Sequence, residues 1–386
     1  MKNNEPRLLL ACTHSFGAKF FQGQLQFMKE NGFDVVVMSA PGKEIEQLCK
    51  DEGATFISFP FRRDISPFSD LKALIQLRKI LKEINPTIIN TGTPKAGLLV
   101  CLAAKIARIK PVIFTLRGLR SETLSGVKKI LVRGMETLTC TLANIVIPIS
   151  PSLNAHAQKS GILSSQKSVV LGVGSSNGVN VEKFTPSLSS EEKAGVRAQL
   201  RIDEKDFVIS YIGRINNDKG VPELFQAFKQ LATDQPTVKL LLVGKFEQED
   251  AISVEIRTEL ETHPQVILES YRDDIKAIYE IIDVLVLYSK REGFGNILIE
   301  ASSMKVPVIA ANIPGCKDAV QHGVSGYLVN TQEELFERLQ YCLNCKEKAK
   351  DLGQQGQKWV RESFDSRIIW NNQLELYKKL LKKFNK

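Results

Sequence analysis

The chain has 386 residues, of which 43% are hydrophobic and 25% are charged, and its formal net charge is +9. This composition is that of an ordinary globular protein, and about 150 residues per domain predicts two or three domains. No apolar run approaches the roughly 20 residues that a membrane-spanning helix needs, and the first expected strand begins too early to follow a signal peptide. We therefore expect a cytoplasmic protein without a transmembrane segment.

Short runs rich in β-branched residues alternate along the chain with longer helical patterns. This alternation predicts α/β domains, each with a parallel sheet that helices cover on both faces. A stretch rich in Gly, Ser and Asn, residues 172–186, separates two series of expected strands. We predict two doubly wound, Rossmann-like domains, residues 1–185 and 186–365, that face an interdomain cleft. The expected strands are 8–12, 34–39, 55–59, 87–91, 111–116, 144–149 and 168–171, then 207–212, 238–243, 266–268, 284–287 and 306–310.

Two glutamates, Glu292 and Glu300, stand eight residues apart on an expected strand–turn–helix segment. The strand-like run 284–289 leads into a turn with two glycines and then into a helix-like run, 296–304. Glycines let backbone N–H groups approach a ligand, and a helix N-terminus attracts anions. Glu292 lies in the turn and Glu300 one turn inside the helix, so the two can face opposite ends of one ligand. The structural alternative is two solvated carboxylates on an ordinary connection.

Residues 291–300, with 306–310 and 323–329, closely resemble the signature of retaining glycosyltransferase family 4. The resemblance implies that Glu292 contacts the hydroxyls of the donor sugar and that Glu300 holds the ribose of the nucleotide. It also implies the two-domain GT-B fold, in which the last helix, residues 366–386, crosses back to the first domain. The turn that the family uses to hold the donor diphosphate corresponds here to Gly293, Phe294, Gly295 and Asn296.

Two cations, Arg214 and Lys219, stand five residues apart where the second domain begins, after a strand and Gly213. Fixed positive groups stabilise the charge that develops on a departing diphosphate. The stretch resembles the Gly-Arg and Lys-Gly element of the family, which implies that both cations hold the diphosphate; the alternative is a solvated surface pair. With four histidines and no Asp-x-Asp sequence, we expect no metal ion. We expect the Cys342-x-x-Cys345 pair to lie on a packed helix face rather than at a metal or redox site.

The first domain follows the family pattern less closely. Gly17 is the only glycine in the loop that the family places near the donor phosphates. After the fifth expected strand, many members carry a histidine before a glycine, and Arg117 occupies that position here. An arginine stays protonated and cannot act as a general base. We therefore expect Arg117 to act as an electrostatic group in the site.

Residues 91–97 and 115–118 are most similar to members that build capsular and lipid-linked polysaccharides. That similarity implies a polyprenyl-diphosphate-linked acceptor, for which Lys95 and Arg120 are candidate ligands. No residue is marked as the carboxylate nucleophile of a double displacement. We therefore expect the front-face retaining mechanism favoured for the family, with a nucleotide sugar, expected to be UDP-linked, as donor and with no cofactor. A sugar-nucleotide epimerase and a non-catalytic donor-binding subunit are the rival hypotheses.

Positive charge is concentrated in the first domain. Residues 1–185 contain 24 Lys and Arg against 13 Asp and Glu, and residues 376–386 add five lysines and no acid. Solubility and nucleic-acid binding are competing explanations, but we find no nucleic-acid motif. We therefore expect the first domain and the C-terminal tail to bind an anionic membrane surface peripherally, through groups that include Lys128, Lys129, Lys378 and Lys379.

Overall fold

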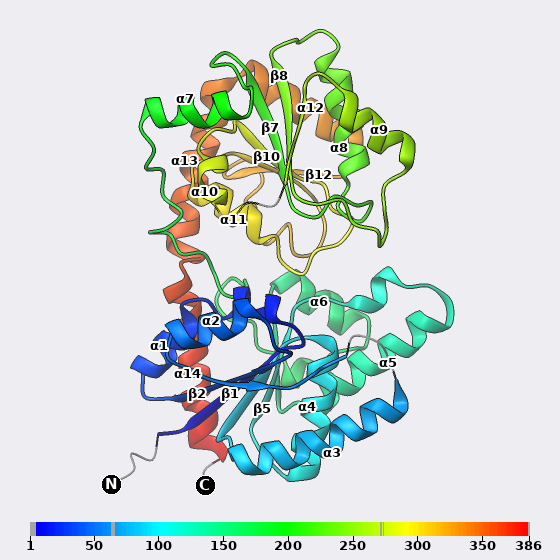
Figure 1. Cartoon of the computed structure of the whole chain (residues 1–386), viewed down its shortest axis with the longest axis vertical. Coiled ribbons are helices and arrows are strands. Elements are labelled where there is room, and N and C mark those ends of the chain that lie inside the picture. The colour runs from blue at the N-terminus through cyan, green and yellow to red at the C-terminus, as the bar shows by residue number, and fades with distance from the viewer. Residues whose placement is uncertain (1–4, 63–65, 271, 273, 385–386) are drawn as a thin grey trace. The chain divides into compact units, whose positions relative to one another are not determined.

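The computed structural model describes residues 5–62, 66–270, 272 and 274–384. The chain forms two compact units, Met1–Asn177 with Arg367–Lys386, and Gly178–Ser366 (Figure 1). The predicted boundaries were 185/186 and 365/366. Residues 178–185 pack with the second unit, because Val179 bridges to Asp365 and the Phe184 carbonyl accepts a 2.7 Å hydrogen bond from Ser303 Oγ.

The first unit is built on a six-stranded parallel sheet with the order β3-β2-β1-β4-β5-β6. Its strand order reverses between β1 and β4, as in a doubly wound sheet. Its strands are β1 (Arg7–Ala11), β2 (Asp34–Ser39), β3 (Thr55–Ser58), β4 (Ile88–Thr91), β5 (Val112–Leu116) and β6 (Ile145–Pro148). Its α-helices are α1 (Gln24–Glu30), α2 (Lys43–Asp51), α3 (Pro67–Ile84), α4 (Pro94–Ala107), α5 (Gly126–Leu142), α6 (Pro151–Lys159) and α14 (Ser366–Phe384).

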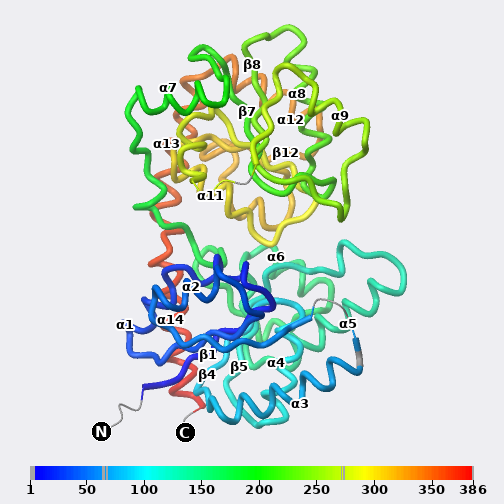
Figure 2. The backbone as a smooth tube through the Cα atoms, in the orientation of Figure 1, coloured from blue at the N-terminus to red at the C-terminus, as the bar shows by residue number. Residues whose placement is uncertain are grey.

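Helices cover both faces of this sheet. Gly97 of α4 lies so close to β5 that a Cβ there would be 2.6 Å from the Phe114 ring. Successive strand residues point to opposite faces, and Ile113, next to Phe114, belongs to the core cluster that contains Tyr377 of α14. α4 and α14 therefore lie on opposite faces, with α3 and α5 packed beside α4 (Figures 1 and 2).

The C-terminal helix α14 is fixed to the first sheet by buried hydrogen bonds. Tyr377 Oη accepts bonds of 2.7 Å from Asn90 Nδ2 and from Gln373 Nε2, and Thr115 Oγ1 donates to Asn90 Oδ1 at 2.8 Å. Gln24 of α1 also donates to Gln373. Burial raises the pKa of the Tyr377 hydroxyl, which stays neutral. The predicted return of the last helix to the first domain is confirmed.

The second unit contains a parallel sheet with the order β12-β11-β10-β7-β8-β9. Its strands are β7 (Phe207–Ile212), β8 (Val238–Val243), β9 (Val266–Glu269), β10 (Val284–Leu287), β11 (Val308–Ala311) and β12 (Gly326–Val329). Its helices are α7 (Ser190–Gln199), α8 (Val221–Ala232), α9 (Val254–Thr262), α10 (Ile275–Tyr279), α11 (Asn296–Ser303), α12 (Gln332–Asn344) and α13 (Lys346–Ser363). Two doubly wound domains are thus confirmed. None of the helices in the described part of the chain is long and apolar enough to span a bilayer.

Two strand predictions differ from the structure. The expected strand 168–171 is wrong: only Ser168 bridges to the sheet, and Leu171 packs against the core cluster instead. β12 was not predicted, because it has only four residues and starts with Gly326. That glycine is needed there, since a Cβ would lie 2.3 Å from the Val308 carbonyl oxygen of the neighbouring strand.

Replacing Tyr377 by phenylalanine should destabilise the first unit by about 1–3 kcal/mol, because two buried amide donors lose their acceptor. Hydrogen exchange followed by mass spectrometry would measure this as faster exchange in α14 peptides, with peptides of the second unit unchanged. Lys379→Ala, at an exposed position of the same helix, is the matched control. Wild-type protection of α14 in Tyr377→Phe would contradict the prediction.

Candidate active site

The candidate site of the second unit lies where its strand order reverses. β7 and β10 are neighbours in the middle of the sheet, and chain order runs outward from them in both directions. Ligands of doubly wound sheets bind beyond the carboxyl ends of the strands at this point. Arg214 and Lys219 follow β7, and Glu292 follows β10. The fold thereby brings together residues that are more than 70 positions apart in sequence.

A close ion pair joins these two connections. Lys219 Nζ is 2.6 Å from Glu292 Oε1, and Ser289 Oγ donates to the same oxygen at 3.0 Å. The exposed fractions of the two charged side chains are 13% and 17%. The Asp218 carboxylate lies 3.9 Å from Lys219 Nζ and 3.4 Å from Arg291 Nη2. The result is a partly enclosed cluster of alternating charges, in which water screens the interactions less than at an open surface.

Gly220 allows the two connections to approach. Its φ is 68°, and a Cβ there would lie 1.9 Å from the carbonyl oxygen of Tyr288. A side chain would thus collide with backbone in a conformation that glycine adopts without strain. The start of α8, which carries Lys219 at its entrance, can therefore lie directly against the end of β10.

Arg214 lies in a more open position. Its side chain is 56% exposed, and Nη1 is 2.8 Å from Glu247 Oε2. Asn216 Nδ2 donates to the same oxygen at 3.3 Å. Glu247, in the connection after β8, was not singled out from the sequence, because a lone glutamate after a strand is no motif. Gly213, which precedes Arg214, has φ 153° and lies against the Tyr211 hydroxyl, where a Cβ would be 2.7 Å away.

The turn before α11 leaves two buried polar atoms without a hydrogen-bond partner among the described residues, Arg291 Nε and Asn296 Oδ1. Buried polar groups are normally paired, so such atoms mark a place where a bound ligand could complete the bonding. Phe294 is buried and packs on Phe364, with ring centroids 5.4 Å apart. Gly295 precedes the first residue of α11, and the Leu298 amide donates to its carbonyl at 2.9 Å.

Glu300 lies inside α11 and accepts a 3.0 Å hydrogen bond from the hydroxyl of Tyr279. Tyr279 is 1% exposed, and burial raises the pKa of its hydroxyl well above the usual value. A neutral, buried donor thus orients the Glu300 carboxylate. The structure places Glu292 in the turn and Glu300 in the helix, as the sequence predicted.

In the first unit, Arg117 is held tightly at the carboxyl end of β5. Nη1 donates to the Gly92 carbonyl at 2.6 Å, Nε donates to Ser176 Oγ at 2.9 Å, and the guanidinium lies 4.3 Å from the Phe20 ring centre. Burial lowers the pKa of Arg117 to about 10, so the group is still cationic at neutral pH. A Cβ on Gly92 would lie 1.6 Å from Nη1, so the glycine makes room for the side chain.

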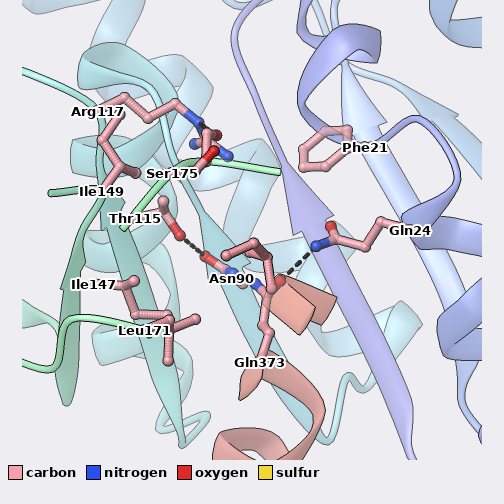
Figure 3. A pocket seen from close by; sticks show the side chains of 12 residues that line it. Phe21, Gln24, Asn90, Thr115, Arg117, Ile147, Ile149, Leu171, Ser175 and Gln373 are labelled. Atoms are coloured by element: carbon pink, nitrogen blue, oxygen red, sulfur yellow. Dashed lines mark hydrogen bonds between the residues drawn. The ribbon is translucent and has the colours of Figure 1, made fainter. Parts of the chain in front are cut away.

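Figure 3 shows the small polar pocket beside Arg117. Asn90 and Thr115 line it from β4 and β5, Gln24 from α1 and Gln373 from the C-terminal helix. Sequence analysis did not identify these four residues, because they lie in four different elements and share no motif. Their mutual hydrogen bonds make the pocket floor part of the contact that holds α14.

The other three predicted residues of the first unit differ in their surroundings. The Gly17 amide donates to the His14 carbonyl at 2.9 Å, and a Cβ on Gly17 would lie 2.4 Å from Cys12 Sγ. Lys95 is 7% exposed and lies 2.5 Å from the Asp70 carboxylate. Arg120 is exposed after β5. Their roles toward donor and acceptor stay predictions. In the described part of the chain, no group of three or more His, Cys, Asp or Glu could hold a metal ion.

Two family models match the chain. Residues 192–359 match the glycosyl transferases group 1 family, and residues 8–150 match the glycosyl transferase 4-like family. The capsular polysaccharide biosynthesis glycosyltransferase CapM of Staphylococcus aureus is 36% identical over 384 residues, which are 99% of this chain and 99% of CapM. The chain belongs to the group 1 glycosyltransferases. The family predicted from the residues around Glu292 is thereby confirmed.

Other comparisons extend over the whole glycosyltransferase. It is 27% identical over 377 residues to N,N'-diacetylbacillosaminyl-diphospho-undecaprenol alpha-1,3-N-acetylgalactosaminyltransferase of Campylobacter jejuni, covering 95% of this chain and 97% of the relative. The crystal structure of Anabaena HepE in complex with UDP-glucose matches with a TM-score of 0.81 at 21% identity, over 97% of this chain and 100% of HepE. This likeness supports the two-domain fold.

Gly92→Ala tests whether the glycosyltransferase needs the Arg117 guanidinium in its observed position beside Gly92. The added methyl group should displace the Arg117 guanidinium, so we expect turnover to fall by about 10²-fold, as in Arg117→Ala, by analogy with loss of one transition-state donor. Steady-state kinetics measure the effect and thermal melting checks the fold. Gly134→Ala is the matched control, because nothing lies within 4 Å of a Cβ there. Wild-type turnover in Arg117→Ala would refute the electrostatic role.

Proposed function

We propose that this glycosyltransferase moves a sugar, with retention of configuration, from a UDP-sugar to a hydroxyl of a polyprenyl-diphosphate-linked glycan during surface-polysaccharide assembly. The observation that carries the proposal is the Lys219–Glu292 pair at the reversal point of the second sheet. In this proposal, Lys219 binds the diphosphate and the neighbouring Glu292 binds the sugar hydroxyls. The names of CapM and of the Campylobacter relative support the glycan class and the lipid-linked acceptor, and the HepE complex supports a UDP-linked donor.

The charges of the site suit an anionic donor. Lys219 is paired with Glu292, and Arg214 with Glu247. When a diphosphate enters, its oxygens replace these carboxylates as partners of the two cations, and Glu292 turns its acceptor atoms to the sugar hydroxyls. Lys219 is thus already positioned and partly desolvated, which is the condition for strong stabilisation of a departing phosphate. Side chains and the N-terminus of α11 then serve where another enzyme uses a metal ion.

A front-face mechanism follows from these assignments. Ser289 Oγ donates to Oε1 of Glu292 and helps to orient the carboxylate, which in this proposal binds the sugar hydroxyls and does not attack the anomeric carbon. The diphosphate departs first, and an oxocarbenium-like ion forms. The acceptor hydroxyl then enters on the face that the diphosphate has left. Its proton passes to the departing phosphate oxygen, so Arg117 is not needed as a base and stabilises negative charge instead.

The decisive experiment incubates the purified protein with UDP-sugars and a short-chain polyprenyl-diphosphate oligosaccharide, with and without EDTA. UDP release that requires the acceptor, and an α-linked product from an α-linked donor by NMR, support the proposal. Conversion of the donor without acceptor indicates an epimerase, and donor binding without UDP release indicates a non-catalytic subunit. A β-linked product overturns retention, and loss of activity in EDTA that Mg²⁺ restores overturns metal independence.

The two glutamates should respond differently to substitution. Glu292→Ala should abolish transfer with little change in affinity for free UDP, because its partner is the sugar. Glu300→Ala should weaken UDP binding by about 1.5–3 kcal/mol, the cost of lost charged hydrogen bonds. Calorimetric titration with UDP measures both. Tyr279→Phe, which keeps Glu300 but removes its donor, should have an intermediate effect. Equal losses of UDP affinity in both glutamate variants would refute this division of roles.

Removing either cation should lower turnover more than it raises the Michaelis constant, because the diphosphate charge is greatest in the transition state. We expect a loss of about 10²–10³ in kcat for Lys219→Ala and for Arg214→Ala. Lys229→Ala, which breaks an ion pair with Glu259 elsewhere in the second unit, is the control and should keep wild-type kinetics. Unchanged kcat with weaker donor binding would contradict a role for these cations in leaving-group departure.

A further inference from the structure

Exposed apolar side chains are concentrated on one helical layer of the first unit. Of the twelve large hydrophobic residues exposed in the described part of the chain, eight lie on α3, α4 or α5. Phe68 and Val127 are the most exposed of them, at 91% and 81%. Exposed apolar side chains that are concentrated on one layer in this way mark an interaction site.

The apolar residues form stripes along the outer sides of α3 and α5. Phe68, Leu71 and Ile75 have the spacing of one face of α3. Val127, Ile130 and Leu131 likewise share one face of α5. Both groups lie in the first turns of their helices. Because each helix follows a parallel strand of the sheet, those turns are at the carboxyl edge, the same edge as Arg117.

The same layer is positively charged. Lys128, Lys129 and Arg133 are exposed among the apolar residues of α5. The three acidic side chains of these helices are already engaged: Asp70 pairs with Lys95, Glu83 with Lys79, and the buried Glu136 accepts bonds from Ser121. Apolar stripes interleaved with cations match a helix that lies in the interface of an anionic bilayer.

A cationic cavity lies between the C-terminal ends of α4 and α5, at the amino edge of the sheet, so the cavity and the apolar stripes lie toward opposite ends of the same helical layer. Its volume is about 580 Å³, and its lining contains four cations, Lys105, Arg108, Lys110 and Lys167, and no acid. Lys167 Nζ also donates to the Ala143 carbonyl at 2.9 Å, so this lysine also caps the C-terminal end of α5. The other three cations are exposed. This arrangement is complementary to a phosphate group.

The C-terminal lysines lie elsewhere. α14 packs on the opposite face of the first sheet from α4, and Lys378, Lys379, Lys382 and Lys383 are exposed there. A flat bilayer cannot cover both outer faces of one sheet at once. The apolar stripes are found only with α3–α5 and not with α14, for which no large hydrophobic residue is exposed in the described part of the chain.

We propose that the first unit binds an anionic lipid bilayer through the outer face of α3, α4 and α5, with the apolar stripes entering the interface and the cationic cavity binding a lipid phosphate. The proposal rests on the proposed function in one respect, since a polyprenyl-linked acceptor is confined to a membrane. The membrane-binding surface predicted from the sequence included the C-terminal lysines. The proposal limits that surface to the face formed by α3, α4 and α5, which does not include those lysines.

Vesicle co-sedimentation at physiological salt tests the proposal, with phosphatidylglycerol–phosphatidylcholine vesicles and with phosphatidylcholine alone. The triple variant Phe68→Ser, Ile130→Ser, Leu131→Ser should bind the mixed vesicles about tenfold or more weakly, because burial of apolar area is lost. Val254→Ser with Val324→Ser, at exposed apolar positions of the second unit, is the matched control and should bind like the wild type.

Charge is tested in the same way. Lys105→Gln, Arg108→Gln, Lys110→Gln should weaken binding to the mixed vesicles about tenfold and leave binding to phosphatidylcholine unchanged. Lys378→Gln, Lys379→Gln, Lys382→Gln removes equal charge from α14 and should change binding less than twofold. A larger loss in the α14 variant than in the cavity variant overturns the choice of face.

The remaining outcomes separate docking from catalysis. Transfer to a short-chain acceptor in detergent should be unchanged in the Phe68, Ile130, Leu131 variant. Wild-type vesicle binding by that variant overturns the docking proposal while the enzymatic proposal stands. Vesicle binding with no transfer to any acceptor refutes the enzymatic proposal alone. Self-association of the wild type that this variant abolishes, without vesicle binding, identifies the face as a protein interface and overturns the proposal.

Discussion

The Lys219–Glu292 ion pair is the interaction on which the arrangement of the candidate site depends. It connects the ends of β7 and β10, the two strands between which chain order reverses, so two distant sequence motifs become one site. Gly220 makes the contact sterically possible, and Ser289 fixes the orientation of the carboxylate. A partly buried charge is costly without a partner. Each member of the pair is therefore the counterion of the other.

The cations of the two candidate regions are held by different kinds of partner. In the second unit, Lys219 and Arg214 are paired with carboxylates, whereas Arg117 of the first unit is bound by a carbonyl, a hydroxyl and an aromatic ring. None of these three partners carries a negative charge. Arg117 therefore keeps its full positive charge, and burial reduces its proton affinity only enough to bring its pKa to about 10. Such a group is suited to a permanent electrostatic role and not to proton transfer.

Periodicity and motifs predicted the architecture because each signal was local. Alternating strand and helix patterns identified eleven of the twelve strands that the structure describes, and the segment around Glu292 identified the family. Contacts that depend on three-dimensional proximity were not predictable in this way. Glu247, in the connection after β8, pairs with Arg214, in the connection after β7. Gly92 is needed because the side chain of Arg117 packs directly against its Cα. Gln373 of the C-terminal helix lines the pocket beside Arg117. Net charge indicated a basic first domain. The sequence could not show that the lysines of α14 and the cations of α3–α5 lie on opposite faces of its sheet.

The return of α14 affects the order in which the protein can fold during synthesis. The second unit is one continuous segment, Gly178–Ser366, so its whole core is present before the chain is finished. The first unit begins with residue 1 but needs Leu374, Tyr377 and Leu380 to complete its core cluster. Domains generally fold as units while the chain leaves the ribosome. Here the half that is made first can complete its core cluster only after the last helix has been synthesised.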